Sequence, residues 1–246
     1  MELNFKMVEL SILMPAYNEG KKIKENLEET KKTLNSFKID YEIILINDAS
    51  KDNTLNEANK VKGIKILSYE KNGGKGNALK YGFQFAKGDL ICFLDSDLEL
   101  HPSLIKSFID IISKTKADVV IGSKRHPDSL INYPLKRRIL SWGYSTFVKF
   151  LFGLNVRDTQ TGIKLFRKEV LDKVFPKVLI KRYAFSLEVL VNAHKLGYRI
   201  VEAPIILNFK RAIGEKRLGF KSIFPMFKDT LAIAYRLYIL RYYDRK

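Results

Sequence analysis

Three carboxylates stand at alternate positions in the segment Asp95-Ser96-Asp97-Leu98-Glu99. In an extended chain, side chains two residues apart point the same way, so Asp95, Asp97 and Glu99 are expected to share a face. Carboxylates on one face repel one another unless a cation lies among them, and oxygen ligands suit Mg²⁺ or Mn²⁺. The alternative is a solvated acidic turn before a helix. The apolar run LICFL before Asp95 favours the metal site.

A glycine-rich segment, Asn72-Gly73-Gly74-Lys75-Gly76, precedes a predicted helix. Its backbone N–H groups and the Lys75 side chain could face a phosphate at the helix start. The segment matches neither common phosphate fingerprint, because no Ser or Thr follows Lys75 and Leu79 occupies the third glycine position of the dinucleotide motif. A simple turn is the other interpretation. The sequence therefore disfavours a P-loop NTPase and a dehydrogenase.

The elements that must position these segments alternate along the first half of the chain. Short apolar runs predict strands at 10–14, 41–46, 64–68, 89–94 and 118–121, and helical patterns lie between them at 20–37, 53–60, 76–86 and 102–114. This alternation predicts an α/β domain with a mostly parallel central sheet flanked by helices. The polar segments, including PAYNE at 15–19 and NDAS at 47–50, follow strand ends and should converge at one sheet edge.

The second half of the chain is less regular. The sequence predicts a loop at 124–135, a helix at 136–153, a turn and a short ordered run at 158–167, a helix at 185–196 and an extended segment at 200–209. Glu188 lies on an otherwise apolar helical stretch, and a buried carboxylate needs a partner, so we expect it to orient an arginine. The chain ends in a basic, aromatic-rich helical pattern at 220–243.

The 246 residues carry a formal net charge of +17, from 44 Lys and Arg against 27 Asp and Glu. Up to Ser123 there are 18 lysines, no arginine and 18 acidic residues, so the whole excess lies from Lys124 onward. Such asymmetry indicates a polyanionic partner: nucleic acid, an anionic membrane or a phosphorylated substrate. The single cysteine, Cys92, excludes an intramolecular disulfide and lies inside an apolar run, where we expect it to be buried.

The ordered set of motifs resembles the family 2 inverting glycosyltransferases with the GT-A (Rossmann-like) fold. The nucleotide-binding motifs are PAYNE, NDAS, GKG at 74–76 and DSDLE at 95–99. Further motifs resemble the branch of dolichyl-phosphate mannose and glucose synthases: GSKR at 122–125, KRRILS at 136–141, DTQTGIKLFR at 158–167, YAFSLE at 183–188 and RAIGEKR at 211–217. The resemblance covers residues 11–218.

The resemblance implies roles for individual residues. Positions that hold the nucleotide sugar are matched by Pro15, Tyr17, Glu19, Asp48, Lys75, Asp95 and Asp97, and the metal is assigned to Asp95, Asp97 and Glu99. Positions that grip the acceptor phosphate are matched by Arg125, Arg137, Arg138, Ser141 and Arg211, and Arg137 and Arg211 join Asp95 and Asp97 as catalytic residues. Two residues depart from the family pattern. Asn47 replaces the first of two aspartates, and Glu99 replaces the glutamine usual in mannose synthases.

These roles imply metal-dependent, inverting transfer of a hexose from a nucleotide sugar, of the GDP-mannose or UDP-glucose type, to dolichyl or polyprenyl phosphate. A lipid phosphate is already an oxyanion at neutral pH, so the reaction needs no general base. A soluble saccharide acceptor is the alternative and would need a base, which no histidine or obvious acidic pair after Ser123 supplies. A nucleic-acid-binding protein would leave Asp95 and Asp97 unexplained. We therefore expect no nucleic-acid partner.

The sequence also predicts how the chain is divided and where it works. We expect a glycosyltransferase domain at 1–218, with a donor half at 1–123 and an acceptor half at 124–218, followed by a basic amphipathic segment at 219–246. That segment is expected to lie in a membrane interface, against the alternative of packing on the domain. No signal peptide or spanning apolar stretch is evident, so we expect a cytoplasmic protein, peripheral on the cytoplasmic face of the membrane.

Overall fold

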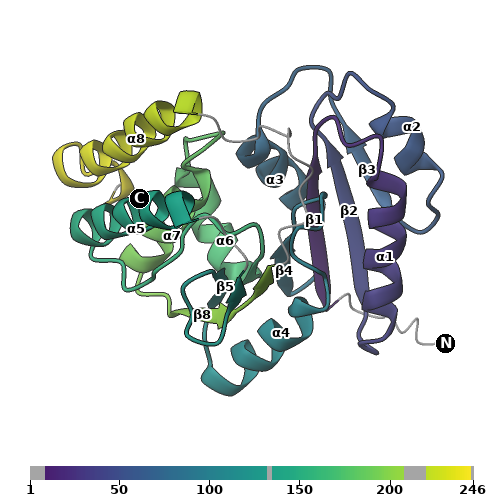
Figure 1. Ribbon diagram of the computed structural model, residues 1–246, viewed down its shortest axis with the longest axis horizontal. Helices are drawn as coiled ribbons and strands as arrows, with labels where there is room; N and C mark the ends of the chain where they lie inside the picture. The colour runs from purple at the N-terminus through teal and green to yellow at the C-terminus, as the bar shows by residue number, and fades with distance from the viewer. Residues whose placement is uncertain (1–8, 132–134, 208–219, 245–246) are drawn as a thin grey trace.

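The computed structural model describes residues 9–131, 135–207 and 220–244, with the backbone alone for 135–141 and 220–223. Within these residues, a seven-stranded sheet has the order β3-β2-β1-β4-β7-β5-β8, and β6 and β9 form a separate parallel pair (Figure 1). The strands are β1 (Leu10–Ala16), β2 (Tyr41–Asn47), β3 (Lys65–Ser68), β4 (Leu90–Phe93), β5 (Val119–Ser123), β6 (Leu130–Ile131), β7 (Lys164–Arg167), β8 (Ile200–Pro204) and β9 (Ile206–Leu207). The five strands predicted in the first half are therefore all present.

One strand of the large sheet runs against the others. β7 is antiparallel to both of its neighbours, β4 and β5, and Lys164 at its start lies opposite Phe93 and Ile121. The remaining pairs in this sheet are parallel. The carboxyl ends of β1, β2, β4 and β5 therefore meet the beginning of β7 at one edge, which is where ligands of such sheets bind.

Helices cover both faces of the sheet. They are α1 (Ile23–Asn35), α2 (Thr54–Asn59), α3 (Lys75–Phe83), α4 (Leu104–Thr115), α5 (Leu135–Phe152), α6 (Lys168–Val174), α7 (Phe185–Lys195) and α8 (Phe220–Ala234). Alternate residues of β2 pack into different cores: Ile43 and Leu45 with α1 and α4, Ile44 and Ile46 with α3 and α7. Burial on both faces explains why the strand sequences are continuous apolar runs.

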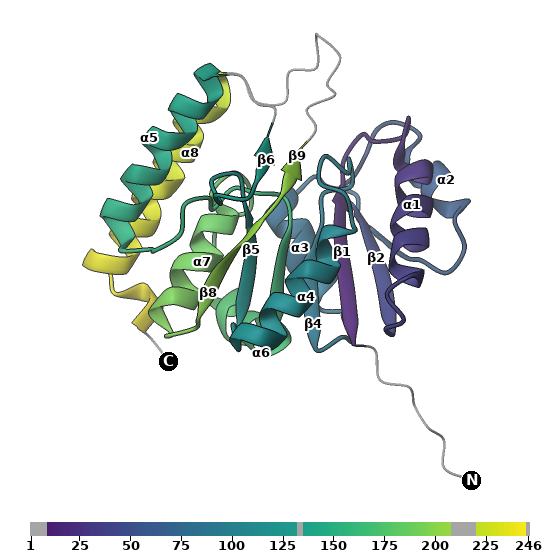
Figure 2. The same ribbon diagram turned by 60° about the horizontal axis from the view of Figure 1, so that its bottom comes forward.

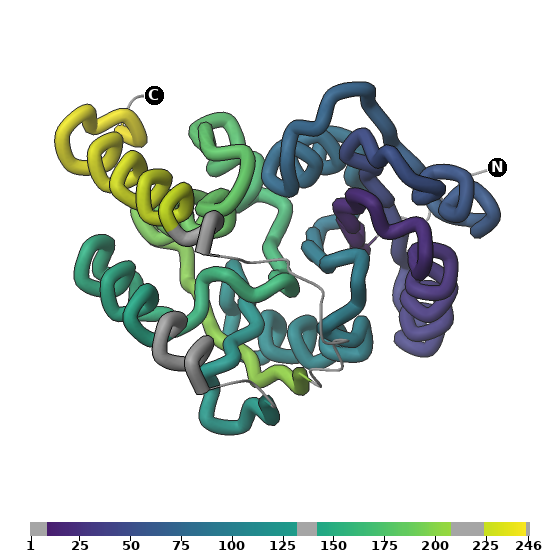
Figure 3. Tube along the Cα trace, turned by 45° about the horizontal axis from the view of Figure 1, so that its top comes forward, coloured from purple at the N-terminus to yellow at the C-terminus, as the bar shows by residue number. Residues whose placement is uncertain are grey.

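The first and second halves of the chain lie on opposite sides of the molecule and share one sheet. Figure 3 shows the elements from β1 to α3, in purple and blue, on one side and those from α6 to α8, in green and yellow, on the other. Strand β7 lies between β4 and β5 and joins the two sides within one sheet. Candidate donor residues from the first half therefore lie on the same sheet as residues from the second half.

Helices α5 and α8 lie side by side as an outer layer (Figures 1 and 2). The Tyr144 hydroxyl of α5 lies 3.0 Å from the Thr230 hydroxyl of α8, and Val148 and Ile233 are buried with them. After α8 the chain makes a π-helical turn, Tyr235–Ile239, and a 3₁₀ turn, Tyr242–Asp244. The predicted helix at 220–243 is therefore shorter and less regular. No helix among the described residues is long and apolar enough to cross a bilayer.

Candidate active site

The ends of β1 and β2 are tied together by backbone and side-chain hydrogen bonds. The Asp48 N–H donates to the Ala16 carbonyl at 2.9 Å, and the Asn18 N–H donates to the Ser50 hydroxyl at 3.0 Å. The Glu19 N–H reaches the Thr54 hydroxyl at 2.8 Å. Pro15 is the penultimate residue of β1, and the Tyr17 side chain beyond it is 42% exposed. The segments PAYNE and NDAS are therefore brought together as the strand order predicted.

Asp48 organises the glycine-rich loop, 72–76. One carboxylate oxygen accepts the Gly73 N–H at 2.7 Å and the Tyr69 hydroxyl at 2.8 Å. The other accepts the Gly74 N–H at 2.8 Å and the Asn72 amide at 2.9 Å. Asp48 is 3% exposed, so these bonds satisfy a buried charge. Its predicted contact with the nucleotide stays a prediction, and its structural role was not foreseen.

The start of α3 is likewise bound to protein. The Gly76 and Asn77 N–H groups both donate to the Lys181 carbonyl, at 2.9 and 3.4 Å. Gly74 has φ 86°, and a Cβ there would lie 2.9 Å from the same carbonyl. Asp48 and Lys181 therefore already accept the N–H groups of Gly73, Gly74 and Gly76, as the simple-turn interpretation predicts. A contact between Lys75 and a phosphate stays a prediction.

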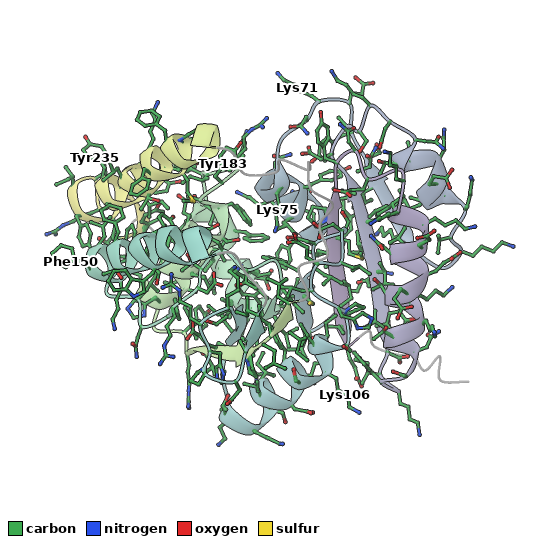
Figure 4. The ribbon with its side chains drawn as sticks, in the orientation of Figure 1. Lys71, Lys75, Lys106, Phe150, Tyr183 and Tyr235 are labelled. Atoms are coloured by element: carbon green, nitrogen blue, oxygen red, sulfur yellow. The ribbon has the colours of Figure 1, made fainter. Side chains whose placement is uncertain are left out.

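Lys75 joins the glycine-rich loop to the end of β4. Its ammonium lies 2.5 Å from Asp95 Oδ1, and both side chains are about 40% exposed. Figure 4 shows Lys75 between the two halves of the molecule. Gly162, just before β7, lies so close that a Cβ there would be 2.3 Å from Asp95 Oδ2. A basic residue from the first half and a loop from the second half therefore both meet Asp95.

The acidic segment after β4 is a turn. The Leu98 N–H donates to the Asp95 carbonyl at 3.2 Å, the Glu99 N–H donates to Asp97 Oδ1 at 3.3 Å, and Leu98 has φ 48°. The expectation of an extended segment with three carboxylates on one face is wrong for this reason. Among the described residues, no three His, Cys, Asp or Glu side chains group closely enough to hold a metal ion. Two carboxylates fit Mg²⁺ or Mn²⁺ when substrate phosphates complete the coordination.

A second charged cluster consists of Lys124, Asp158 and Lys164, and the charge of Asp95 acts on Lys164. Asp158 is buried, its carboxylate lies 2.9 Å from the Lys124 ammonium, and it accepts the Lys124 N–H at 3.1 Å. Lys164, the first residue of β7, is 2% exposed and donates from its ammonium to the Thr161 carbonyl. Sequence reasoning missed Lys164 and the Lys124–Asp158 pair. A lysine within the apolar run IKLF was the available signal for a buried charge.

Burial and nearby charges shift the pKa values of this cluster. Burial lowers the pKa of Lys164 to about 7, and Lys75 adds to that shift, whereas Asp158 and Asp95 oppose it. Burial alone would raise the pKa of Asp158, but the Lys124 ammonium and hydrogen bonds hold it below its usual value. Burial also lowers the pKa of Arg125, and the carboxylates of Asp158 and Glu202 oppose this shift. Buried charges of both signs therefore lie close to Asp95.

The predicted acceptor residues are described only in part. Arg125 follows β5, and its N–H donates to the Ser123 hydroxyl at 3.2 Å. Arg137, Arg138 and Ser141 lie in the first two turns of α5, but their side chains are not among those described. Arg211 lies outside the described residues. The predicted acceptor role of these five residues stays a prediction.

Comparisons with known proteins agree with the arrangement. The family model for glycosyl transferase family 2 matches residues 11–175. The dolichyl-phosphate beta-glucosyltransferase of Dictyostelium discoideum is 34% identical, over 92% of this chain and 74% of the relative. The Saccharomyces cerevisiae protein with the same name is 32% identical, over 94% of this chain and 76% of its own.

Solved structures share the fold. Glucosyl-3-phosphoglycerate synthase from Mycobacterium tuberculosis, in complex with Mn²⁺, UDP and phosphoglyceric acid, has a TM-score of 0.69 at 19% identity, over 93% of this chain and 78% of that chain. Mannosyl-3-phosphoglycerate synthase from Rubrobacter xylanophilus has a TM-score of 0.70 at 16% identity, over 95% and 75%. The predicted fold, a GT-A arrangement with a mostly parallel sheet between helices, is confirmed. The chain belongs to family 2 of the glycosyltransferases.

Proposed function

We propose that this glycosyltransferase transfers glucose from a nucleotide sugar to a dolichyl or other polyprenyl phosphate. The observation that carries the proposal is the identity of 34% to a dolichyl-phosphate beta-glucosyltransferase over 92% of the chain. The names of the relatives support glucose rather than mannose as the sugar. The mannosyl-3-phosphoglycerate synthase shares only the fold at 16% identity, so it does not argue for mannose.

The donor is proposed to bind at the edge formed by β1, β2 and β4. Pro15 lies at the end of β1, Tyr17 and Glu19 follow it, and Lys75 lies beside Asp95 at the end of β4. Asp95 and Asp97 would hold a divalent cation, which supplies positive charge at the sugar diphosphate. Support for a metal comes from the oxygen donor set and from Mn²⁺ in the structures of the fold relatives.

The acceptor is proposed to approach from the second half of the chain. Its phosphate is already a nucleophilic oxyanion, so this chain needs to position it and offset its charge, with no proton to remove. Arg125, Arg137, Arg138, Ser141 and Arg211 are proposed for that task, since planar guanidinium groups bind phosphate in a bidentate manner. Inversion at the anomeric carbon would follow from one in-line displacement. The division into a donor half at 1–123 and an acceptor half at 124–218 is part of this proposal.

A membrane surface is proposed to dock on the α5–α8 layer. The outward faces carry exposed large apolar side chains: Trp142, Phe150, Phe224, Leu231, Tyr235, Tyr238 and Ile239. Phe150 is 90% exposed, and Figure 4 shows it and Tyr235 pointing away from the body. Basic residues such as Lys149 and Lys228 lie on the same helices. Aromatic side chains beside basic ones suit a membrane interface, which would bring the enzyme to the proposed lipid acceptor on the cytoplasmic face.

The test pairs a donor panel with two acceptors. UDP-glucose, GDP-mannose and UDP-N-acetylglucosamine are each supplied with dolichyl phosphate or a soluble oligosaccharide, with Mn²⁺ or with EDTA. We expect transfer from UDP-glucose to dolichyl phosphate, loss of transfer in EDTA and a β-linked product by NMR. Transfer to the oligosaccharide alone would instead establish the soluble-acceptor alternative. Transfer of mannose alone would refute the sugar assignment.

A substitution tests the metal assignment within the same assay. Asp97→Asn keeps the side-chain shape but removes the charge, so we expect turnover to fall by about 10² or more, with an unchanged thermal midpoint. Asp110→Asn, on the exposed surface of α4, is the matched control and should leave turnover unchanged. Near-normal turnover in Asp97→Asn would remove Asp97 from the proposed metal site.

A further inference from the structure

A cavity of about 600 Å³ lies where three segments of the chain meet. The first segment is the glycine-rich loop with Lys71, the second is the loop before α7 with Lys181 and Arg182, and the third is the C-terminal segment with Asp229 and Arg236. None of Tyr17, Asp95 and Asp97 is among its lining residues. Its volume is in the range of small-molecule sites, so we define it as the junction site and examine its chemistry.

The junction site is cationic. Lys71, Lys181, Arg182 and Arg236 line it, against the single carboxylate of Asp229. The Arg236 guanidinium is paired with the carboxylate of Glu188, which is fully buried and accepts an Arg236 N–H at 2.9 Å. Three cations and one carboxylate then remain at the cavity wall. A ligand that carries negative charge is the one this wall complements.

Two guanidinium groups of the wall are held in place before any ligand arrives. Arg236 donates to the Tyr243 hydroxyl at 3.0 Å as well as to Glu188, and its side chain is 16% exposed. Arg182 donates to the Asn72 side-chain oxygen at 3.1 Å. A guanidinium carries five N–H donors, so one or two such contacts fix its plane and leave donors for a ligand. Planar, fixed guanidinium groups match the oxygen geometry of a phosphate.

The walls of the junction site are also linked to the candidate active site. The Lys181 carbonyl accepts the N–H groups that begin α3, and the Glu188 carboxylate accepts the Leu179 and Ile180 N–H groups at 3.0 and 2.7 Å. Lys75 lies at the start of α3 and reaches Asp95. A ligand that bridges the three segments would therefore hold the loop that carries Lys75.

We propose that the junction site binds a phosphate-bearing anion and is separate from the nucleotide-sugar site. The anion comes either from a soluble phosphate compound or from an anionic lipid headgroup, and both present the same phosphate chemistry. The ligand would stiffen the glycine-rich loop against the C-terminal segment. This inference does not depend on the proposed transfer reaction, because the cavity and its charges stand without it.

The experiment uses hydrogen–deuterium exchange on the full chain without divalent cations. The probes are inorganic phosphate, compared with chloride at equal ionic strength, and phosphatidylcholine vesicles with or without phosphatidic acid. The variant Lys71→Gln/Lys181→Gln removes two lining cations but leaves the Arg182–Asn72 and Arg236–Glu188 contacts in place. The matched control is Lys32→Gln/Lys62→Gln, in a separate lysine-lined depression beside α1.

We expect phosphate to slow exchange at 71–77 and 179–182 in the parent chain and the control, with binding at least about tenfold weaker in Lys71→Gln/Lys181→Gln. The same pattern with phosphatidic acid vesicles alone would support the site and identify a lipid headgroup as the source. No protection with either probe would overturn the proposal. Equal weakening in the control variant would also overturn it, since it would mean that general surface charge binds the anion.

Discussion

The contact between Lys75 and Asp95 pairs opposite charges at the carboxyl end of β4. The two groups lie 2.5 Å apart, and each is partly exposed, so solvent and ligands can compete for both. A diphosphate offers Lys75 a stronger anionic partner, and a cation offers Asp95 a new one. Under the proposed function, donor and metal binding together would replace this ion pair. The residues that contact substrate would then be exchanging partners rather than waiting unpaired.

Lys164 gives a prediction at the residue scale. Its pKa falls, mainly through burial, from 10.5 to about 7, so between these pH values the unfolded chain binds a proton that the folded chain does not. The free energy of unfolding should therefore rise with pH across this window. Lys164→Met lacks this dependence, so its stability relative to the parent chain should decline from pH 7 to pH 10, by on the order of 4 kcal/mol.

Urea unfolding at the two pH values measures this difference. Lys106→Met, an exposed position on α4 that Figure 4 labels, serves as the control and should show a nearly constant difference. A parallel pH profile for Lys164→Met and the parent chain would contradict the shifted pKa.

At the scale of elements, the C-terminal segment is fastened to the body through Glu188. The Tyr243 hydroxyl donates to this carboxylate at 2.5 Å beside Arg236, and burial together with Glu188 raises the pKa of Tyr243. Lys177 donates to the Tyr243 carbonyl at 2.9 Å. The expectation that Glu188 orients an arginine is confirmed. The segment thus packs on the domain with one face while the other face stays exposed.

Removal of Arg236 should weaken this fastening. Arg236→Met leaves the buried Glu188 charge with fewer donors, so we expect the free energy of unfolding to fall by about 2–3 kcal/mol. Lys24 forms an exposed ion pair with Glu28 at 3.9 Å, so Lys24→Met should lower the free energy of unfolding by less than about 1 kcal/mol. Denaturant titrations measure both. The double variant Glu188→Gln/Arg236→Met should lose less than the sum of its single changes, and simple additivity would speak against the coupling.

The elements of the first half could be predicted because each one follows from the pattern of apolar residues within its own segment. The apolar runs of β1 and β2 and the stripe of Ile23, Leu27 and Leu34 on α1 need no distant information. The direction of β7 could not be predicted, since it depends on pairing with β4, which lies far away in the sequence. The partners of the glycine-rich loop were hidden for the same reason: Lys181 is more than a hundred positions from Gly76. Local patterns located the site, and long-range contacts decided which groups in it were already satisfied.

At the scale of the whole molecule, the proposed docking of the α5–α8 layer on a membrane predicts one orientation at a bilayer. The variant Phe150→Ser/Tyr235→Ser removes two outward aromatic side chains that are 90% and 54% exposed. Vesicle binding should weaken by about tenfold or more, because each side chain loses apolar burial in the interface. Cosedimentation with anionic vesicles measures it.

The control for this surface is Leu196→Ser, which is 45% exposed just beyond α7. It should bind vesicles like the parent chain, and all variants should retain their thermal midpoints. Unchanged binding by Phe150→Ser/Tyr235→Ser would move the membrane contact elsewhere on the molecule.

The antiparallel strand β7 has a consequence for how the chain reaches its native state. β4 and β5 are consecutive strands along the sequence. In the sheet, however, they are separated by β7, which comes later in the chain. A nascent chain that has emerged only as far as β5 leaves an open edge on β4, and such edges invite pairing with other chains. Completion of the sheet needs a long-range loop closure, which slows folding. The strand that precedes Asp95 thus gains its neighbour on this side only after residues 164–167 have been synthesised.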